Sequence, residues 1–519
     1  MQFDRFLNEL SGKSGAIVTF AQGKATRHDY ATLAVDVTRT RQDLERWGII
    51  PGMRVGIFAP NSYAYVVHDL ALISAGAISV AFTDDFAGSV DRALVDRYDI
   101  ALMLVAKGTS HGFKQDDNFV ALIDGNNDDV QALPRAPYSQ GDQPGDLSLA
   151  FSSGSAGGLK GLVISRRGAE LTLPPIAEAL GLSPGDRLLL FLPMSNFQQR
   201  MMYYASIWYD FDLIVTDYTR LYPAMKVLRP TVLIAPPILY QLIHTRFSAP
   251  GSRTWRHRIG ERLLNFPLGK VLRQKIASFA YRDVHALFGG RMRLLATGMA
   301  PISPHVSRFF DRVMLPLCES YGLAEAGSLT FRTPHAGAYG SVGKLLAGVD
   351  VSFEPDGEII VHREAFLTRR YFQCAAGENE ATFLGSGAVA TGDIGRLDAD
   401  GNLHLLGRKK ELIVTSAGYK IHPEVLESTL NACEDVVQSV VFQKPGTSHL
   451  SCVVVRGSDR SEEAARRIRK HVEGATAGKK VKIGEIAFAE EAFSRENGML
   501  RPNMKLNRKG IAARYARAS

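Results

Sequence analysis

The chain has 519 residues, more than one hydrophobic core usually accommodates, so two or more domains are expected. Hydrophobic residues make up 45% and charged residues 22% of the sequence, which excludes an extensively disordered chain, and no uncharged apolar stretch reaches the roughly 18 residues of a transmembrane helix. The formal net charge is +8, but no nucleic-acid-binding motif accompanies it, so we expect solvated basic surface or attraction to phosphate-bearing small molecules rather than nucleic acid.

Short apolar runs alternate with spacers of helical length through the first part of the chain. These runs are Val55–Phe58, Ile78–Phe82, Ala101–Val105, Leu147–Phe151, Leu188–Leu192, Leu213–Val215, Val232–Ala235 and Leu294–Ala296. Alternation of this kind is typical of parallel strands covered by helices, so it predicts α/β sheets. Ligands of such sheets bind at the carboxyl ends of the strands.

A loop rich in hydroxyl groups and glycine follows the predicted strand Leu147–Phe151. It reads Ser152-Ser153-Gly154-Ser155-Ala156-Gly157-Gly158-Leu159-Lys160. Glycine lets the backbone approach an anion, the serine hydroxyls can donate to phosphate oxygens, and the lysine can neutralise charge. A Walker loop is excluded, because Leu159 and Gly161 stand where it needs glycine and a hydroxyl residue. The pattern predicts a nucleotide site of another kind, with a flexible linker as the alternative.

The pattern changes near residue 340. Val349–Phe353, Gly357–Val361 and Leu403–Leu406, with Asp-Gly turns at 356–357 and 400–401, predict antiparallel hairpins. A strand at Leu412–Val414, a helix from Pro423 and a strand at Val437–Phe442 then form a further α/β unit. We therefore place the domain junction near residues 408–410, with a first domain of residues 1–407 and a second of residues 408–519.

Two further features bear on the cellular compartment. The cysteines Cys318, Cys374, Cys433 and Cys452 are far apart and lack metal-ligand spacing, which fits a reducing environment. Residues 1–13 mix charged and apolar side chains and lack the apolar core of a signal peptide. We therefore expect a cytoplasmic protein.

Three segments in order resemble motifs of the acyl- and aryl-activating adenylate-forming enzymes, which include acyl-CoA synthetases and luciferases. Tyr321-Gly-Leu-Ala-Glu325 resembles the family's Tyr-Gly-x-Thr-Glu, and Thr391-Gly-Asp393 resembles its ribose-binding Thr-Gly-Asp. Residues 407–418, Gly-Arg-Lys-Lys-Glu-Leu-Ile-Val-Thr-Ser-Ala-Gly, resemble its hinge and the loop beyond. The order and spacing of the matches carry the resemblance over nearly the whole chain. It implies a large domain of stacked α/β sheets with a small β-barrel-like hairpin region, and a mobile α+β lid domain hinged near Lys410.

The resemblance also implies a nucleotide site. Its expected ATP- or AMP-binding residues are Ser152, Ser153, Gly154, Ser155, Gly157, Gly298, Met299, Ala300, Tyr321, Gly322, Asp393 and Arg408. A carboxylate at 393 can accept bonds from both ribose hydroxyls, a guanidinium at 408 can bind ribose or phosphates, and a tyrosine can stack on adenine. Glu325 offers oxygen ligands for Mg²⁺ and is expected to be catalytic together with Lys160. Surface ion pairs, core packing and a helix cap are the structural alternatives for these residues.

The closest resemblance is to the long-chain fatty-acyl branch. Leu192-Pro-Met-Ser-Asn-Phe-Gln-Gln-Arg200 resembles that branch's Leu-Pro-Leu-Ser-His-x-Phe-Glu-Arg, and residues 496–509 resemble its C-terminal motif. In this motif Lys505 aligns with the family's adenylation lysine, with Arg508 and Lys509 as nearby alternatives. The expected acyl pocket is lined by Asn196, Phe197, Arg200, Met201 and Ser320, although the same side chains could be plain core.

Departures from the family pattern keep a second interpretation open. Ala324 replaces the usual threonine, Asn196 replaces a histidine, and the loop and the segment before Thr391 also differ, at Ala156, Leu159 and Ala388. A lost hydroxyl contact is worth about 0.5–1.5 kcal/mol, which slows turnover without abolishing it. A nucleotide-binding pseudoenzyme is therefore an alternative to an active enzyme.

The implied reaction is a two-step ligation that uses ATP, Mg²⁺ and CoA as co-substrate. A carboxylic acid, expected to be a fatty acid, forms an acyl-adenylate with the help of Lys505, and a rotation at Lys410 then presents Ala417 and Gly418 beside a pantetheine tunnel. An aryl acid, a carrier-protein phosphopantetheine as acceptor, and a luciferase-like oxygenase are alternatives. Weak association with a membrane surface is a further expectation.

Overall fold

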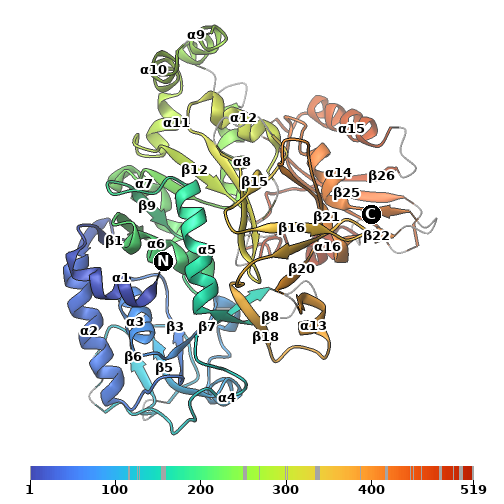
Figure 1. The fold of residues 1–519 in the computed structure, drawn as a ribbon. Coiled ribbons are helices and arrows are strands. Elements are labelled where there is room, and N and C mark those ends of the chain that lie inside the picture. The colour runs from blue at the N-terminus through green and yellow to red at the C-terminus, as the bar shows by residue number, and fades with distance from the viewer. Residues whose placement is uncertain are drawn as a thin grey trace.

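The computed structural model describes residues 2–114, 117–125, 127, 129–153, 159–248, 254–267, 269–298, 300, 302–333, 339–385, 387–414, 419–444, 446–447, 449–457, 459–477, 482–494, 496–501 and 506–516. These residues form two large mixed sheets, a smaller antiparallel sheet, and a C-terminal unit that packs helices on a three-stranded sheet (Figure 1). The predicted α/β class, with a large sheet-rich N-terminal part and a smaller C-terminal part, is confirmed.

The first large sheet has the strand order β18-β8-β7-β4-β3-β5-β6. Its strands are β3 (Arg54–Phe58), β4 (Ile78–Ala81), β5 (Ile100–Val105), β6 (Val120–Leu122), β7 (Asp146–Ser153), β8 (Leu159–Ser165) and β18 (Thr368–Phe372). The predicted runs form β3, β4, β5 and β7, which pair in parallel. Strand β7 then pairs antiparallel with β8 up to Ser153 and Leu159, so a hairpin partner follows the predicted phosphate loop.

The second large sheet has the order β15-β14-β13-β12-β11-β9-β10-β1-β2. Its strands are β1 (Ala16–Ala21), β2 (Lys24–Asp29), β9 (Arg187–Leu190), β10 (Asp212–Val215), β11 (Val232–Ile234), β12 (Leu294–Thr297), β13 (Leu317–Leu323), β14 (Gly327–Phe331) and β15 (Lys344–Leu345). Pairing is parallel from β13 through β12, β11, β9 and β10 to β1, and antiparallel at both edges. The four predicted apolar runs in this region form the parallel centre.

Helices accompany the sheets in both parts of the molecule. They are α1 (Phe3–Glu9), α2 (Tyr30–Arg46), α3 (Tyr63–Ser74), α4 (Arg92–Arg97), α5 (Arg166–Ala179), α6 (Phe197–Trp208), α7 (Leu221–Leu228), α8 (Pro237–Ser248), α9 (Trp255–Leu264), α10 (Lys270–Ala280), α11 (Arg282–Leu287), α12 (Pro304–Arg312), α13 (Glu378–Thr382), α14 (Pro423–Leu430), α15 (Glu462–Thr476) and α16 (Arg508–Ala516). Side-chain caps set several starts: Asp29 accepts from the Thr32 N–H, Ser62 from Tyr65 and Ser165 from Gly168.

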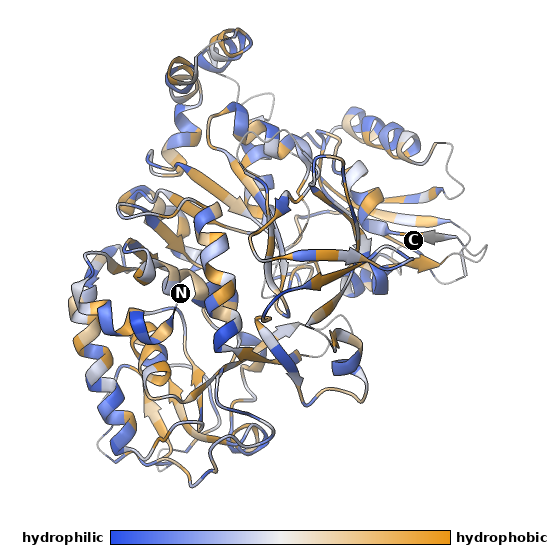
Figure 2. Ribbon diagram, viewed as in Figure 1, coloured by the Kyte–Doolittle hydropathy of each residue, from blue (hydrophilic) through white to orange (hydrophobic). Residues whose placement is uncertain are grey.

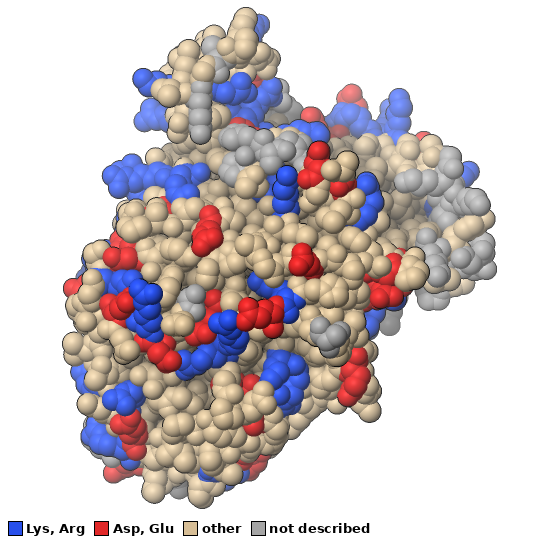
Figure 3. All heavy atoms as spheres, viewed as in Figure 1, with Lys and Arg blue, Asp and Glu red and all other residues tan. Residues whose placement is uncertain are grey.

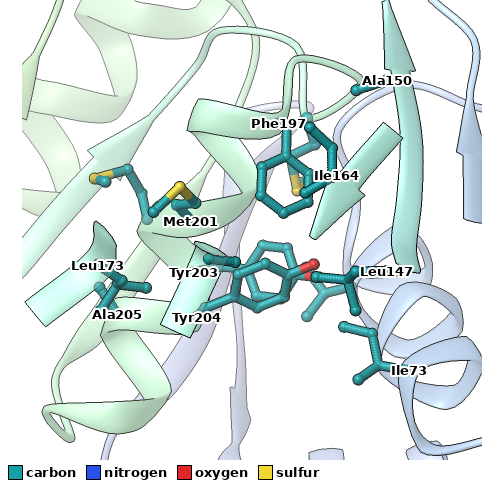
Figure 4. Close-up of a cluster of buried hydrophobic side chains, with 14 of the residues drawn as sticks. Ile73, Leu147, Ala150, Ile164, Leu173, Phe197, Met201, Tyr203, Tyr204 and Ala205 are labelled. Carbon is teal, nitrogen blue, oxygen red and sulfur yellow. The ribbon is translucent and has the colours of Figure 1, made fainter. Parts of the chain in front are cut away.

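One continuous apolar core joins the two large sheets. It contains one face of each sheet together with side chains of α2, α3, α5 and α6. Figure 4 shows its centre, where Phe197 and Tyr204 of α6 lie against Leu147 and Ile164 of β7 and β8. Figure 2 shows that the strands of both sheets are predominantly hydrophobic. A strand that is buried on both faces must be apolar along its whole length, and the strands of the two stacked sheets meet this requirement.

The antiparallel sheet confirms the predicted hairpins. Its strands are β16 (Asp350–Phe353), β17 (Glu358–His362), β19 (Phe383–Leu384), β20 (Ala388–Leu397) and β21 (Leu403–Arg408). Strands β16 and β17 pair across the turn at 356–357, and β20 and β21 pair across the turn at 400–401. Gly357 and Gly401 have φ angles of +84° and +79°, which glycine adopts without strain.

The C-terminal unit has its own buried side chains. It contains a hairpin of β22 (Ile413–Val414) and β23 (Lys420–Ile421) and a sheet of β24 (Val436–Phe442), β25 (Leu450–Arg456) and β26 (Ile483–Phe488), covered by α14, α15 and α16. Its two apolar clusters are separate from the core of the large sheets. This separation fits the predicted junction after residue 407, which stays a prediction. Among the described residues, no helix combines the length and apolar composition that crossing a bilayer requires.

Candidate functional site

Three of the predicted nucleotide-binding residues meet where β13, β20 and β21 come together. The Tyr321 hydroxyl donates to Asp393 Oδ2 at 2.8 Å, and Arg408 Nε lies 3.0 Å from Asp393 Oδ1. Asp393 and Arg408 are direct partners in the β20–β21 ladder. Tyr321 and Asp393 are 8% and 5% exposed, whereas the Arg408 side chain is 51% exposed, so a buried carboxylate pairs with an arginine that reaches the surface.

The Thr-Gly-Asp segment has a local reason for its residue types. Thr391 Oγ1 donates to the Ile359 carbonyl at 2.8 Å and accepts from the Asp393 N–H at 3.0 Å. Gly392 has a φ of +70° and donates its N–H to Glu358 Oε1 at 3.0 Å. The threonine and the glycine therefore hold the turn that directs the carboxylate of Asp393 toward Tyr321 and Arg408.

The electrostatic surroundings fix the protonation of this group. Burial raises the pKa of Tyr321 well above its usual value, and the Asp393 carboxylate raises it further, so the phenol stays a neutral donor. Burial lowers the pKa of Arg408, but Asp393 and Glu411 outweigh that effect and leave it raised. Arg408 is thus a permanent cation beside a buried carboxylate.

Lys160 and Glu325 are joined by a tyrosine of β18. The Tyr371 hydroxyl donates to Glu325 Oε1 at 2.7 Å, and Lys160 Nζ lies 4.4 Å from the centre of the Tyr371 ring. Lys160 Nζ also lies 3.0 Å from Glu378 Oε1. The structure therefore brings together two predicted catalytic side chains that are far apart in the sequence. Neither Tyr371 nor Glu378 was predicted.

The two groups lie within electrostatic reach of each other and of the predicted hinge. Glu325 is one of the carboxylates that raise the pKa of Arg408. The hydrogen bond from Lys160 lowers the pKa of Glu378, and the positive charge of Lys410 contributes to the same shift. Lys410 is exposed in the short 3₁₀ turn Lys409–Glu411, directly after Arg408. These interactions place Lys160, Glu325 and Lys410, the predicted hinge residue, in one region with the Tyr321–Asp393–Arg408 group.

The segment after β12 approaches β13 closely. A Cβ at Gly298 would lie 3.0 Å from Ser320 Oγ, and a Cβ at Gly322 would lie 2.5 Å from the Gly327 carbonyl oxygen. Ser320 Oγ donates to the Thr297 carbonyl at 3.5 Å. Glycine at 298 and 322 is therefore explained by this packing, whether or not a nucleotide binds beside it. Ala300 is exposed on the same segment.

The predicted acyl-pocket residues of α6 make core contacts. Asn196 caps the helix by accepting from the Gln198 N–H at 3.2 Å, and Phe197 and Met201 are buried in the core of Figure 4. Arg200 is fully buried, and its Nη1 lies 2.7 Å from Asp69 Oδ1. These contacts support the alternative of core packing for Phe197, Arg200 and Met201, and a place in an acyl pocket stays a prediction for them.

Several predicted site residues lie outside the part of the chain that the structure describes. Ser152 pairs with Lys160 in the β7–β8 ladder. Outside the described residues lie the side chain of Ser153 and all of Gly154, Ser155, Gly157, Met299, Ala417, Gly418 and Lys505. The alternative to Lys505, Arg508, is bound within the C-terminal unit, where its Nη1 donates to Glu427 Oε1 at 2.6 Å. Among the residues that the structure describes, no three His, Cys, Asp or Glu side chains gather as a metal site.

Residues 9–371 match the sequence model of the AMP-binding enzyme family. The chain belongs to this family. The long-chain fatty-acid–CoA ligase FadD15 of Mycobacterium tuberculosis is 26% identical over 547 residues, which cover 90% of this chain and 88% of the relative. The human long-chain fatty-acid–CoA ligase 1 is 24% identical, with 88% of this chain and 76% of the relative covered. The predicted membership of the adenylate-forming family is confirmed.

Solved structures agree on the fold of this AMP-binding enzyme. ATP-bound MatB from Rhodopseudomonas palustris superposes with a TM-score of 0.72 at 20% identity, covering 99% of both chains. The anthranilate CoA ligase AuaEII in complex with anthranoyl-AMP gives 0.75 at 16% identity, covering 99% of this chain and 97% of that one. At these identities the likeness concerns the fold alone.

The family match covers part of the site described above. Lys160, Glu325 and Tyr371 lie inside the matched range 9–371, whereas Asp393, Arg408 and Lys410 lie beyond it. Hydrogen bonds and ladder pairing connect the two parts, since Tyr321 of the matched range donates to Asp393. The candidate site therefore contains residues on both sides of the end of the matched range.

Proposed function

We propose that this AMP-binding enzyme activates a fatty acid to its acyl-adenylate and transfers the acyl group to the thiol of CoA, releasing AMP and pyrophosphate. Family membership and the ligase names of its relatives support an acid–thiol ligase of the AMP-forming kind. The observation that carries the proposal is the meeting of Tyr321, Asp393 and Arg408 beside Glu325 and the loop lysine Lys160.

In the first step a carboxylate oxygen of the acid attacks the α-phosphorus of ATP, and the bond to the pyrophosphate oxygen breaks. Positioning and charge neutralisation dominate this kind of transfer. Asp393 is suited to hold the ribose, Lys160 and Arg408 supply positive charge, and Lys505 is proposed to bridge the carboxylate and the α-phosphate. Glu325 is a hard oxygen ligand that fits a Mg²⁺ ion carried by the phosphates, and such an ion would neutralise the leaving pyrophosphate.

In the second step the thiol sulfur attacks the acyl carbonyl of the mixed anhydride, the bond to the AMP oxygen breaks, and the thiol proton is released. We propose that the unit of residues 408–519 rotates at Lys410 between the steps, which removes Lys505 and brings Ala417 and Gly418 to the acceptor tunnel. The exposed position of Lys410 directly after the last strand of the antiparallel sheet supports a hinge there.

The acceptor and the acid class belong to the same proposal. CoA is favoured over the phosphopantetheine of a carrier protein, because the named relatives are CoA ligases. A fatty acid is favoured over an aryl acid on the same ground, together with the C-terminal motif around Lys505. A cytoplasmic location is likewise proposed and rests on the sequence features alone.

Mass spectrometry after incubation with MgATP, CoA and a panel of fatty and aryl acids tests the function. Acyl-CoA and AMP from fatty acids are the expected products. Adenylate and AMP without acyl-CoA would point to a carrier-protein acceptor, and acyl-CoA from aryl acids alone would overturn the substrate class. The absence of any product would overturn the ligase and favour a nucleotide-binding pseudoenzyme.

Substitution of Lys505 tests adenylate formation and thioester formation separately. Lys505→Ala is expected to suppress adenylate formation while leaving thioester formation from supplied acyl-adenylate intact. Lys509→Ala, in the same basic segment, is the matched control and should retain both. An equal loss of both half-reactions in Lys505→Ala would contradict the role of Lys505.

A further inference from the structure

The helical hairpin of α9 and α10 carries apolar side chains on its solvent-facing side. In Figure 1 the two helices project from the top of the molecule, beyond α11 and α12. The exposed apolar residues of this hairpin are Trp255, Ile259, Leu263, Phe266, Val271, Leu272 and Phe279, which we call the hairpin face. Trp255, Phe266 and Val271 are 65%, 61% and 70% exposed. Apolar side chains gathered in this way mark interaction sites.

The spacing along α9 shows that the exposure is systematic. His257, Gly260 and Leu264 form the buried side of the helix, whereas Trp255, Ile259 and Leu263 recur every fourth residue on the opposite side. The helix therefore has two apolar sides, and only one of them packs on the protein. Packing within the protein explains the buried side of α9. It does not explain the apolar residues on the exposed side.

The two helices that carry the hairpin face pack closely against each other. A Cβ at Gly260 would lie 2.2 Å from Ala280 Cβ, so α9 and α10 approach each other as closely as glycine allows. The rings of Trp255 on α9 and Phe279 on α10 lie 6.0 Å apart, edge to face. The hairpin face is thus continuous across both helices.

Basic side chains lie among these apolar ones. Between residues 254 and 288 the sequence has seven Lys or Arg and two acidic residues. In the described part of this segment the ion pairs are Arg256 with Asp283 and Arg312 with Glu261, which leaves the exposed Arg258, Arg262 and Lys275 without an acidic partner. Figure 3 shows blue atoms around tan ones at this end of the molecule. The segment carries net positive charge.

We propose that the hairpin face docks on a membrane surface that contains anionic lipids. Tryptophan, phenylalanine and branched apolar side chains enter the boundary between headgroups and acyl chains, and arginine and lysine beside them pair with lipid phosphates. The geometry of a projecting, convex pair of short helices suits a broad flat surface.

Charge favours a membrane over a second copy of this chain. A symmetric dimer through the hairpin face would bring two positively charged segments together, and the acidic residues that could pair with them are few. An anionic bilayer complements both the apolar and the basic side chains. The proposal concerns a surface and not the reaction, so its test does not depend on ligase activity.

Flotation with vesicles tests the proposal on the full chain. The probes are vesicles of phosphatidylcholine alone and of an equal mixture of phosphatidylcholine and phosphatidylglycerol. The protein is expected to float with the mixed vesicles at low salt, with binding at least tenfold weaker to phosphatidylcholine alone and reduced by added salt, because salt screens the contacts to the lipid phosphates.

Two sets of substitutions separate the contribution of the apolar side chains to membrane binding from that of the basic side chains. Trp255→Ser with Phe266→Ser and Phe279→Ser should abolish flotation, and Arg258→Gln with Arg262→Gln and Lys275→Gln should remove the preference for anionic vesicles. Val35→Ser with Val227→Ser, exposed apolar positions on α2 and α7, is the matched control and should float like the parent protein. Unchanged circular dichroism and melting temperature verify folding of each variant.

Quenching of tryptophan fluorescence by brominated lipid tests whether Trp255 contacts the membrane, without relying on the triple variants. The parent protein should be quenched, and Trp255→Phe should retain flotation but lose most of the quenching. Equal binding of parent and triple variants, or quenching unchanged in Trp255→Phe, would overturn the proposal. Self-association without lipid that the serine variant abolishes would overturn it in favour of a second copy.

Discussion

Two arginines, one fully buried in the N-terminal core and one partly buried in the C-terminal unit, stand in opposite electrostatic situations. Arg200 in the N-terminal core faces one carboxylate: its Nη1 lies 2.7 Å from Asp69 Oδ1 and donates to Ser79 Oγ at 2.9 Å. The Tyr204 hydroxyl donates to the other oxygen of Asp69 at 2.8 Å. The pair is balanced in charge, both side chains are fully buried, and neighbouring hydroxyls form hydrogen bonds with both partners.

Arg508 in the C-terminal unit faces three carboxylates instead. It binds Glu427 through both terminal nitrogens, its Nε lies 3.1 Å from Glu411 Oε2, and its Nη2 lies 3.9 Å from Glu424 Oε1. Burial raises the pKa of Glu424 well above its usual range, and the hydrogen bond to Glu411 raises it further. A retained proton on Glu424 therefore contributes to the charge balance of this group.

The comparison shows two ways in which charge is balanced around an arginine. The Arg200 pair links α6 to α3 and β4 through one cation and one carboxylate. The Arg508 group lies beside the predicted hinge, where a Cβ at Gly407 would be 2.9 Å from Glu424 Oε2, and its stability depends on a proton. Substitutions can therefore distinguish a charge-balanced group from a proton-balanced one.

Arg200→Met is expected to have the largest effect. It leaves Asp69 buried without its cation, which costs about 3–5 kcal/mol in the free energy of unfolding. Urea unfolding followed by circular dichroism measures the loss. Arg39→Ala is the matched control, because Arg39 pairs with Asp36 at 2.8 Å on the exposed surface of α2, and it should change stability by less than about 0.5 kcal/mol. Equal effects of the two substitutions would show that the buried pair is not needed.

Arg508→Met should have a smaller and pH-dependent effect. It removes the cation that Glu411 and Glu427 share, but Arg408 and Arg501 also act on Glu411, and further protonation can offset the loss. We expect about 1–3 kcal/mol at neutral pH and less at mildly acidic pH, where the carboxyls bind protons. Hydrogen exchange in β24 and α14 across this pH range measures it. Arg514→Ala, also on α16, serves as the control, and a loss that does not vary with pH would contradict the proton-balanced description.

The same features show what the sequence could and could not predict. Strands β3, β4, β5, β9, β10, β11 and β12 were predicted because strands buried on both faces are continuous apolar runs. The hairpins after residue 340 were predicted because Asp-Gly allows the positive φ of the turn. Strands β8 and β18 carry Lys160, Arg369 and Arg370, so neither reads as an apolar run. Their mutual pairing joins segments about two hundred residues apart and has no local signal.

The candidate site divides in the same way. Residue types and family motifs predicted Asp393, Arg408, Lys160 and Glu325, but not how they meet. In the β20–β21 ladder Leu397 pairs with Leu403, and that register alone would place Asp393 opposite Gly407. A one-residue shift between Ile394 and Gly395 places it opposite Arg408 instead. Nothing in the sequence marks this bulge. The link through Tyr371 depends on the unpredicted pairing of β18 with β8.

Glu424→Gln should give the smallest effect and is the sharpest test of the proton in the Arg508 group. Because burial and Glu411 raise the pKa of Glu424, the folded protein keeps a proton that the unfolded chain loses at lower pH. The associated stability is complete below the unfolded pKa and is lost as pH rises through the folded pKa. Glutamine has nearly the same shape as glutamate and cannot ionise. The free energy of unfolding of the variant should therefore rise by about 1 kcal/mol relative to that of the parent protein as the pH is raised from the unfolded to the folded pKa of Glu424.

Unfolding by urea at a series of pH values measures this relative gain. Glu434→Gln, which removes an exposed carboxyl of the same unit, should show no such trend. If the Glu424→Gln variant were less stable than the parent at high pH, Glu424 would be an ionised partner of Arg508, and the charge around both arginines would be balanced in the same way. If the gain grows with pH, the hinge-side group differs from the Arg200 pair in one proton, and the contrast between a fixed core and a pH-dependent C-terminal unit holds.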